Sequence, residues 1–575
     1  MENKGIADIF NVIAQLMSLS DKPTARFEVR AYQKAALTIE TLQEPIEDIY
    51  KKGGLKELME LPGIGKSIAS HIEEYIKTGK IKKYEELKKR YPFDMGSLTT
   101  ITGMGAKKAI LLYKKLGIKN LSDLKKAAES HKISGLEGFG VKSEGAILKS
   151  LAIQEASKGR MFIEDALPEA ESLINKLAGS GLVEKVMIAG SARRMRETVG
   201  DIDILAISKK NEDVMEFFTK MKEVSGIIAK GPTKSTVMLK LGISCDLRVL
   251  EPKSFGAAVQ YFTGSKDHNI QTRTIAVKKG YKLNEYGLFN RKGRNVGGVE
   301  EESIYGKLGL QWMPPEMREA RGEVELAQQH KIPTLVERKD IHGDLHTHTR
   351  ESDGINTLEE MADAARKLGY EYITNSDHTK STPIANGKDD KGFERILKHV
   401  DKLNDQLDGK FTVLKGAECD ILKDGSLDLS KKTLKQMDCV LGAVHNNTMM
   451  EKKQMTDRIV KALDSGLIHV LAHPTGRIVG KREPYQVDLE KVAEAAERNN
   501  VALEINSTRR MDLSDTNIML VSKYKIMFAI DTDSHRTNDY SFMRYGVGTA
   551  RRGWLQKDRI LNTLPLKDMM KRLAK

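Results

Sequence analysis

Nine side chains between residues 346 and 535 could bind metal ions, and nearly every one lies where a predicted β-strand ends. Neutral imidazoles mixed with carboxylates, with no cysteine among them, are typical of two or three Zn²⁺ or Mn²⁺ ions rather than of a closed structural zinc site. The set predicts a multinuclear metal-dependent hydrolase in the C-terminal part of the chain. The nine residues are His346, His348, Asp353, His378, Glu418, His445, His473, Asp533 and His535.

A second candidate site consists of three aspartates on predicted strands. Asp201 and Asp203 open the strand DIDILAIS. Their alternation places both carboxylates on one face, while the isoleucines of the strand enter the core. Asp246 lies on a further strand, within VMLKLGISCDLRVL. Three converging carboxylates can bind two Mg²⁺ ions, the arrangement that supports displacement reactions at phosphorus.

An Asp-x-Asp pair alone is more often a solvated strand end, but the upstream sequence favours nucleotidyl transfer. Gly190 and Ser191 form a predicted turn, and Arg193 and Arg194 follow it. Backbone N–H, hydroxyl and guanidinium groups are the donors that a triphosphate requires. The pattern G-S-x(8)-G-D-x-D, with a later strand aspartate, resembles the palm of nucleotidyltransferases.

Three N-terminal segments, 61–79, 101–117 and 136–152, share an x-G-x-G pattern followed by a helix with basic residues in its first turn. Glycines two positions apart allow a tight turn, and the free N–H groups of the next helix can bind an anion. This is the helix-hairpin-helix pattern, which grips DNA phosphates without reading bases. Three copies make an ordinary helix-to-helix turn a poor explanation. The predicted DNA-contacting residues are Gly63, Gly65, Lys66, Gly103, Gly105, Lys107, Gly138, Gly140 and Lys142.

The segments YFTGSKDHNIQTRTIA (261–276) and KLNEYGLF (282–289) closely resemble the thumb of family X DNA polymerases, the relatives of polymerase beta. With the hairpins in front and the histidine-rich part behind, the chain resembles a prokaryotic family X DNA polymerase with a C-terminal PHP domain. The resemblance covers essentially all 575 residues.

The resemblance implies roles for the central residues. Asp201, Asp203 and Asp246 would bind the catalytic metals, and Arg273 would face the nascent base pair or the template. The aromatic pair at 261–262 would flank the sugar, unless it is plain core. The implied nucleotide contacts are Gly190, Ser191, Arg194, Gly200, Tyr261, Phe262, Gly264 and Asn269.

For the nine C-terminal ligands, the resemblance implies a trinuclear site that hydrolyses phosphodiesters. The implied activity is a 3′–5′ exonuclease, with abasic-site endonuclease and 3′-phosphate removal as further possibilities. The implied cofactors are two Mg²⁺ in the palm and up to three Mn²⁺ or Zn²⁺ in the PHP domain. The implied substrates are gapped or primed DNA and deoxynucleoside triphosphates.

Two positions depart from the family pattern. His71 stands where relatives that remove 5′-deoxyribose phosphate carry a lysine that forms a Schiff base. Imidazole cannot form that imine, so lyase activity would depend on Lys66 or Lys34 taking its place. Lys266 stands where the beta relatives carry an acid beside the incoming base, so their nucleotide selectivity does not carry over.

The order of the expected helices and strands indicates several domains. Strand and helix segments alternate from about residue 339, which favours a closed parallel (β/α) barrel with its catalytic groups at the C-terminal strand ends. The whole fold is therefore expected to combine α-helical helix-hairpin-helix domains, an α+β nucleotidyltransferase palm with a thumb, and a C-terminal (β/α) PHP barrel. The expected boundaries are 1–84 (lyase-like helical domain), 85–153 (fingers), 154–250 (palm), 251–315 (thumb), 316–338 (linker) and 339–575 (PHP domain).

Composition narrows the class of protein. Residues 1–340 hold 56 Lys and Arg against 45 Asp and Glu, so most of the net charge of +14 lies there. Such an excess suits a polyanion partner or a solvated lysine-rich surface. No long apolar run predicts a membrane segment, and three cysteines without a CxxC spacing fit a reducing cytoplasm. We expect a cytoplasmic monomer.

Two other interpretations remain at this point. The barrel could be a small-molecule phosphatase tethered to a DNA-binding module, although the palm and thumb motifs argue against it. Alternatively, the barrel could hold metal for structure only, beside an active polymerase, although nine ligand positions argue against a purely structural role.

Overall fold

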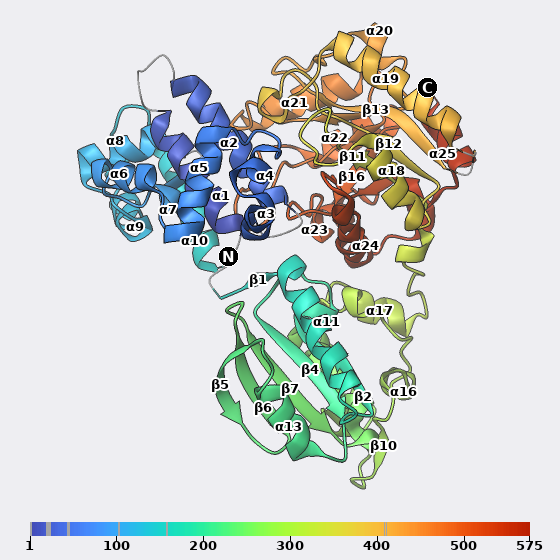
Figure 1. The fold of residues 1–575 in the computed structure, drawn as a ribbon. Helices are drawn as coiled ribbons and strands as arrows, with labels where there is room; N and C mark the ends of the chain where they lie inside the picture. Colours follow the sequence, from blue (N-terminus) through green and yellow to red (C-terminus); the bar gives the residue numbers. More distant parts are fainter. Residues whose placement is uncertain are drawn as a thin grey trace.

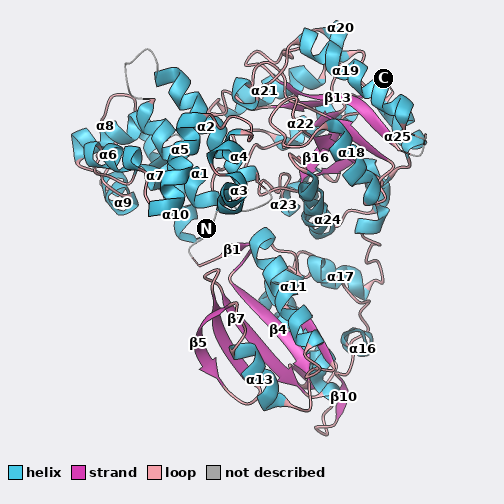
Figure 2. Ribbon diagram, viewed as in Figure 1, coloured by secondary structure: helices cyan, strands magenta, loops and turns pink. Residues whose placement is uncertain are grey.

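The computed structural model has three parts: a helical N-terminal part, a mixed-sheet part and a C-terminal barrel (Figure 1). It describes residues 3–18, 25–42, 46–99, 101, 104–156, 159–407, 409 and 411–574. Figure 2 shows the strands gathered in the second and third parts. Within the described residues, no helix is both long and apolar enough to cross a membrane.

The N-terminal part is built from amphipathic helices around two separate cores. In the first helix, Ile6, Phe10 and Ile13 recur on one face and are fully buried. One core joins the helices up to about residue 81, and the other joins those from residue 95 onward. The helices are α1 (Asn3–Met17), α2 (Ala25–Thr41), α3 (Ile46–Gly53), α4 (Leu55–Met59), α5 (Lys66–Thr78), α6 (Lys82–Arg90), α7 (Met95–Thr99), α8 (Ala106–Leu116), α9 (Leu121–Glu129) and α10 (Val141–Ala156).

The palm is a five-stranded sheet in the order β2-β4-β7-β6-β5, in which β4 and β7 are parallel. The expected strand alternation is confirmed: Ile202, between the two aspartates of β4, and Ile204, directly after them, are both fully buried. Its elements are β1 (Met161–Phe162), α11 (Ile163–Gly179), β2 (Lys185–Ile188), α12 (Gly190–Arg193), β3 (Thr198–Val199), β4 (Asp201–Ile207), α13 (Asn211–Thr219), β5 (Val224–Lys230), β6 (Lys234–Leu239) and β7 (Ser244–Leu250).

The thumb packs helices against a three-stranded sheet, and the segment after it is packed too. Val324 and Ala327, within the expected linker, belong to the same apolar core as the thumb residues Leu288 and Ile304. The elements are η1 (Pro252–Ser254), α14 (Phe255–Thr263), α15 (Lys266–Lys278), β8 (Lys282–Asn284), β9 (Gly287–Phe289), β10 (Asn295–Gly297), α16 (Glu301–Lys307), η2 (Pro315–Met317), α17 (Glu323–Gln328) and η3 (Arg338–Asp340).

Seven parallel strands, in chain order from β11 to β17, form the C-terminal barrel. The barrel is nearly closed, because Thr347 at the end of the first strand forms a parallel bridge with Ser534, three residues after the last strand. The strands are β11 (Gly343–Thr347), β12 (Tyr372–Asn375), β13 (Thr412–Asp420), β14 (Cys439–Ala443), β15 (Val470–Leu471), β16 (Ala502–Asn506) and β17 (Phe528–Asp531). The expected parallel barrel is thereby confirmed.

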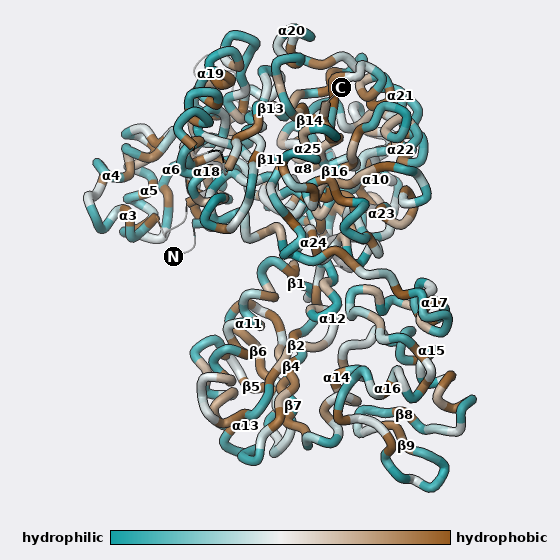
Figure 3. The backbone as a smooth tube through the Cα atoms, turned by 90° about the vertical axis from the view of Figure 1, so that its right-hand side faces the viewer, coloured by the Kyte–Doolittle hydropathy of each residue, from teal (hydrophilic) through white to brown (hydrophobic). Residues whose placement is uncertain are grey.

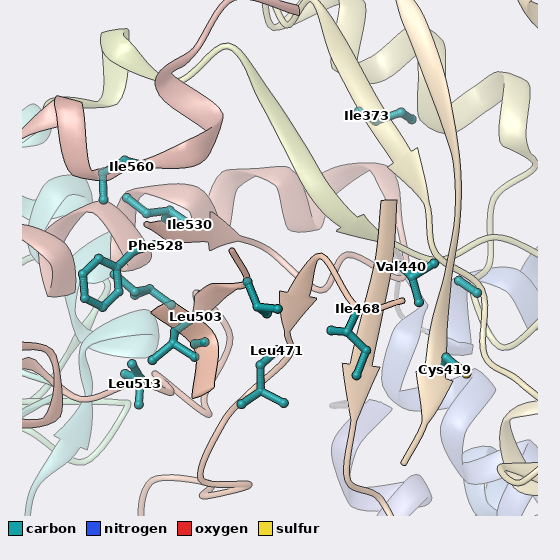
Figure 4. Packing of buried hydrophobic residues seen from close by; sticks show 14 of the residues in the cluster. Ile373, Cys419, Val440, Ile468, Leu471, Leu503, Leu513, Phe528, Ile530 and Ile560 are labelled. Atoms are coloured by element: carbon teal, nitrogen blue, oxygen red, sulfur yellow. The ribbon is translucent and has the colours of Figure 1, made fainter. Parts of the chain in front are cut away.

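Helices surround this barrel and bury one continuous apolar core. Figure 4 shows part of it, with Ile373, Val440 and Leu503 projecting from strands and Ile560 from the C-terminal segment. Figure 3 shows hydrophobic residues along the strands of the palm sheet and of the barrel, and hydrophilic residues along outer helices such as α19 and α22. The helices are α18 (Leu358–Lys367), η4 (Pro383–Ala385), α19 (Asp390–Gln406), α20 (Lys431–Leu434), α21 (Lys452–Leu463), α22 (Leu489–Arg498), α23 (Asp515–Val521), η5 (Thr537–Phe542), α24 (Met543–Arg552), η6 (Lys557–Arg559), η7 (Leu561–Thr563) and α25 (Leu566–Leu573).

Arginines of the barrel join it to the palm and to the segment behind the thumb. Arg509 contacts Glu164 at 2.8 Å and Asp165 at 2.7 Å, and Arg544 contacts Glu171 at 3.0 Å. Arg551 and Arg552 form further pairs with residues 316 and 319. The barrel is therefore docked on the palm and on the segment behind the thumb by charged contacts along one side.

Candidate active sites

The structure brings the nine predicted ligands together at the C-terminal ends of the barrel strands. Glu418 on β13 is the centre: His473 Nε2 and His445 Nε2 lie 2.8 and 3.1 Å from its Oε1, and His378 Nδ1 lies 2.9 Å from its Oε2. On the other side, His535 Nε2 lies 3.3 Å from Asp353. Three overlapping groups have ligand atoms close enough to share an ion: His348, Asp353, His378 and His535; His346, His348 and Glu418; and His378, Glu418 and His445.

The chemistry of this cluster fits divalent metal ions. His346 Nε2, both ring nitrogens of His348 and Glu418 Oε2 are buried and have no hydrogen-bond partner among the described residues. Leaving such groups unsatisfied is costly, and a bound cation would satisfy them. Burial and the neighbouring His535 lower the pKa of His348 to about 4, so its imidazole is neutral, the form that binds metal.

A second layer of acids orients the imidazoles. Glu504 Oε1 lies 2.6 Å from His346 Nδ1, and Asp420 Oδ1 lies 3.1 Å from His445 Nδ1. Such contacts fix which ring nitrogen faces the metal. Neither acid was among the predicted site residues. Glu504 had one usable signal, a carboxylate in the otherwise apolar strand VALEIN.

Arg510 is a further residue at this site that the motifs did not reveal. Its Nε lies 3.6 Å from Asp533 Oδ2, and its Nη1 is buried without a hydrogen-bond partner among the described residues. A guanidinium group beside a metal cluster can bind a phosphate oxygen. The sequence shows only an Arg-Arg pair after β16, which is unremarkable on its own.

In the palm, the three aspartates converge as expected. β4 and β7 pair in parallel with Asp203 directly beside Asp246, and Asp201 lies two residues earlier on β4. Burial and repulsion from the other two aspartates raise the pKa of Asp203 to about 7. Carboxylates forced together in this way have the charge and the oxygen atoms that Mg²⁺ needs.

The carboxylate of Asp246 also has protein partners. It accepts a hydrogen bond from Thr236 Oγ1 at 2.6 Å and pairs with Lys234 Nζ at 2.9 Å. Gly190 lies on the other side of the triad with φ of 65°, and a Cβ there would lie 2.3 Å from Asp203 Oδ2. The turn at residue 190 therefore requires glycine.

A cavity of about 600 Å³ joins the palm and the thumb above these aspartates. It contains eleven of the thirteen palm and thumb residues predicted to act here. Asp246 is not on its wall, and neither is Arg193, whose guanidinium group instead pairs with Glu301 at 2.9 Å. Arg160, Arg196, Lys266 and Glu319 line it in addition. The predicted residues on its wall are Gly190, Ser191, Arg194, Gly200, Asp201, Asp203, Tyr261, Phe262, Gly264, Asn269 and Arg273.

The helices of the three N-terminal hairpins begin where the x-G-x-G pattern predicts. α5, α8 and α10 each begin one residue after the second glycine of their segment. No side chain of the described residues caps the first two helices, and Lys66, Lys107 and Lys142 in the three first turns are exposed. Their N-termini can therefore receive phosphate oxygens. Gly103 lies outside the described residues.

The residues relevant to lyase chemistry lie around the first hairpin. The ring of His71 stacks on Tyr32 at 6.1 Å, and its Nδ1 lies 3.6 Å from Glu74. The side chain of Lys34 packs against Gly63, so close that a Cβ there would lie 2.5 Å from Lys34 Cγ. The aliphatic part of the Lys34 side chain therefore lies against the hairpin, while imidazole stands at the position expected for the Schiff-base lysine.

Comparison with known proteins assigns the chain to known domains part by part. Residues 1–81 match a helix-hairpin-helix domain, and residues 95–152 match a SAM-like helix-hairpin-helix tandem. Residues 258–319 match the DNA polymerase beta thumb, and residues 344–508 match the PHP domain.

Three relatives resemble the chain over different lengths. DNA polymerase lambda of Arabidopsis thaliana is 25% identical over 55% of this chain and 62% of its own length. A Thermoanaerobacter sp. (strain X514) protein named "Probable phosphatase" is 27% identical over 38% of this chain and 89% of its own length. The DNA polymerase/3′-5′ exonuclease PolX of Bacillus subtilis (strain 168) is 36% identical over 99% of both chains. With that match along the whole length, the chain belongs to the family X DNA polymerases that carry a C-terminal PHP domain.

Proposed function

We propose that this chain fills short gaps during DNA repair, extending the primer with its palm and trimming 3′ ends with its barrel. Its activities are those of a DNA polymerase and a 3′–5′ exonuclease, and its substrates are DNA and deoxynucleoside triphosphates. We further propose that it acts as a monomer, and that abasic sites and 3′-phosphates are additional substrates of the barrel.

One observation carries the polymerase assignment. Asp203 and Asp246 are aligned in register on parallel strands, with Ser191 and Arg194 in the cavity beside them. Three carboxylates next to a hydroxyl and a guanidinium group suit a triphosphate whose charge is shared with two Mg²⁺ ions. When bound, those ions would lower the charge repulsion at the reacting phosphorus.

The side chains of the cavity can then orient the nucleotide. Ser191 and the backbone of Gly190 can donate to phosphate oxygens at the start of α12, and Arg194 can bind the triphosphate from the side. The rings of Tyr261 and Phe262 meet edge to face with centroids 5.1 Å apart, which makes a rigid wall for the sugar. Asn269 is fixed by donating to Tyr261 O at 2.7 Å.

In the barrel, the nine ligands would hold up to three Mn²⁺ or Zn²⁺ ions. Such ions polarise a phosphodiester and favour attack by water. Glu504 and Asp420 keep His346 and His445 oriented, and Arg510 can neutralise an oxygen of the scissile phosphate. The resulting chemistry is removal of nucleotides from a DNA end.

Two variants test both halves on gapped DNA with Mn²⁺ and nucleotides. Asp203→Asn should lower the rate of primer extension at least 100-fold, because it removes a carboxylate from the palm. It should leave degradation intact when nucleotides are omitted, because the barrel is unchanged. His348→Ala should do the reverse, because it removes a ligand shared by two of the barrel groups. Degradation that survived His348→Ala would contradict the barrel as the nuclease site.

A further inference from the structure

We propose that the barrel contributes to nucleotide binding in the palm, with Arg552 acting through Glu319 as a positioning residue for Arg194. This rests on the proposed role of Arg194 as a triphosphate contact. The barrel would then support the polymerase as well as carrying the nuclease.

Two protein contacts hold the guanidinium group of Arg194. Its Nε donates to Glu319 Oε1 at 3.0 Å, and its Nη1 donates to the backbone oxygen of Thr263. The side chain is 12% exposed and lies on the wall of the cavity. Glu319 therefore fixes the direction in which the guanidinium group faces the cavity.

Glu319 is shared between the palm and the barrel. The same Oε1 that accepts from Arg194 also accepts from Arg552 Nη1 at 2.9 Å, and Arg196 approaches Oε2 at 3.5 Å. Arg552 Nη1 donates in addition to the backbone oxygen of Arg194 at 2.8 Å. One barrel side chain thus contacts both the partner of Arg194 and its main chain.

Arg552 is itself anchored within the barrel. It is the last residue of α24, its side chain is 3% exposed, and its Nη2 donates to Asp515 Oδ2 at 2.6 Å. Asp515 also pairs with Arg321 at 3.3 Å, and Arg321 donates to the backbone oxygen of Arg552 at 3.0 Å. The guanidinium group of Arg552 is consequently fixed in place from the barrel side.

The balance of charge explains why this matters for nucleotide binding. With Arg552 present, the single negative charge of Glu319 is shared between the buried guanidinium groups of Arg194 and Arg552, with Arg196 at 3.5 Å, so Arg194 keeps a positive field toward the cavity. Without Arg552, a larger share of that charge would neutralise Arg194, and the backbone of Arg194 would lose a contact. A triphosphate would then meet a weaker and less ordered contact, which raises KM for the nucleotide more than it lowers kcat.

The test is single-nucleotide gap filling by the full-length enzyme, with KM for the nucleotide and kcat measured separately. Arg552→Gln should raise KM roughly tenfold, change kcat less than threefold and leave exonuclease activity unchanged. Arg552→Lys, which keeps the charge, should recover at least half of the lost affinity. Arg544→Gln is the matched control, since it removes another palm–barrel ion pair, with Glu171, that does not touch the cavity.

Other variants separate this inference from the role of Arg194. Arg194→Gln should raise KM by more than Arg552→Gln does, and Glu319→Gln should add little once Arg552 is gone, because the two act on one group. If Arg194→Gln left KM unchanged, the assigned nucleotide contact would be wrong. The inference itself would be overturned if Arg194→Gln raised KM while Arg552→Gln left it unchanged. It would also be overturned if Arg544→Gln raised KM as much as Arg552→Gln does. The thermal midpoint of Arg552→Gln identifies an unfolded variant. In that case Asp515→Asn, which keeps Arg552 but removes the charge of its anchor, must show a rise in KM, or the inference fails.

Discussion

At the scale of the residue, the metal cluster shows what its neighbours contribute. Glu504 is fully buried and its Oε1 lies 2.6 Å from His346 Nδ1, which fixes the nitrogen that faces the other ligands. We predict that Glu504→Gln lowers the apparent affinity of the nuclease for Mn²⁺ by about 10- to 100-fold, as loss of such partners typically does. A Mn²⁺ titration of 3′-end degradation measures it, with primer extension as the internal reference.

The matched control for that change is Glu494→Gln, an exposed carboxylate on α22. It should leave the Mn²⁺ dependence where it is. An unchanged titration curve in Glu504→Gln would mean that His346 is oriented by its other contacts, and that Glu504 has no part in metal binding.

The metal-binding residues and the residues that join the domains differ in how well the sequence predicts them. The nine ligands and the palm aspartates follow strand ends or strand alternation, so a local pattern identifies them. Glu319 and Arg552 are 233 positions apart and meet only because two domains dock. No local pattern in either segment encodes that contact, and the same holds for Arg510 beside Asp533.

At the scale of the element, the thumb is held to the palm by a buried ionic cluster. Glu301 at the start of α16 accepts from Arg193 Nη1 at 2.9 Å and from Trp312 Nε1 at 3.1 Å. It also pairs with Arg318, whose side chain is fully buried. Burial alone would raise the pKa of Glu301, but the two guanidinium groups hold it well below its usual range.

We predict that Glu301→Gln destabilises the protein by about 3 kcal/mol, because it leaves a buried guanidinium group without its counter-charge. The drop in the thermal unfolding midpoint measures it, and Glu302→Gln, on the exposed side of α16, should change little. Because the folded pKa of Glu301 is depressed, its contribution is complete above about pH 4.5 and is lost as the pH falls below that value. The difference between wild type and Glu301→Gln should therefore shrink on acidification; a constant difference would contradict the assignment.

Some of these elements can be predicted from the sequence, and others cannot. The parallel barrel and the helices after each x-G-x-G turn follow from period and turn residues. The packing of 316–328 against the thumb does not, because Pro-bounded polar sequence gives no sign of its partners: Arg318 reaches Glu301, and Glu323 lies 2.8 Å from the buried His268.

In the whole molecule, the palm and the barrel must act on DNA that is bound by the same N-terminal hairpins. The hairpins lie beside the barrel, and Lys142 at the third hairpin pairs with Glu451 of the barrel at 2.5 Å. Both partners are largely exposed, so this pair adds little stability. A DNA phosphate can therefore replace Glu451 as the partner of Lys142 at small cost.

We predict that Lys66→Ala with Lys107→Ala weakens DNA binding to the same extent on unrelated sequences and lowers the salt slope of log Kd by about two, since each lysine neutralises one phosphate. Fluorescence anisotropy on two gapped duplexes of different sequence, from 50 to 200 mM salt, measures both quantities. The control is Lys77→Ala with Lys114→Ala, which removes the same charge from the last turns of the same two helices. If that control lowered the slope equally, overall charge rather than the hairpin N-termini would bind the backbone; a loss confined to one sequence would mean that the hairpins read bases.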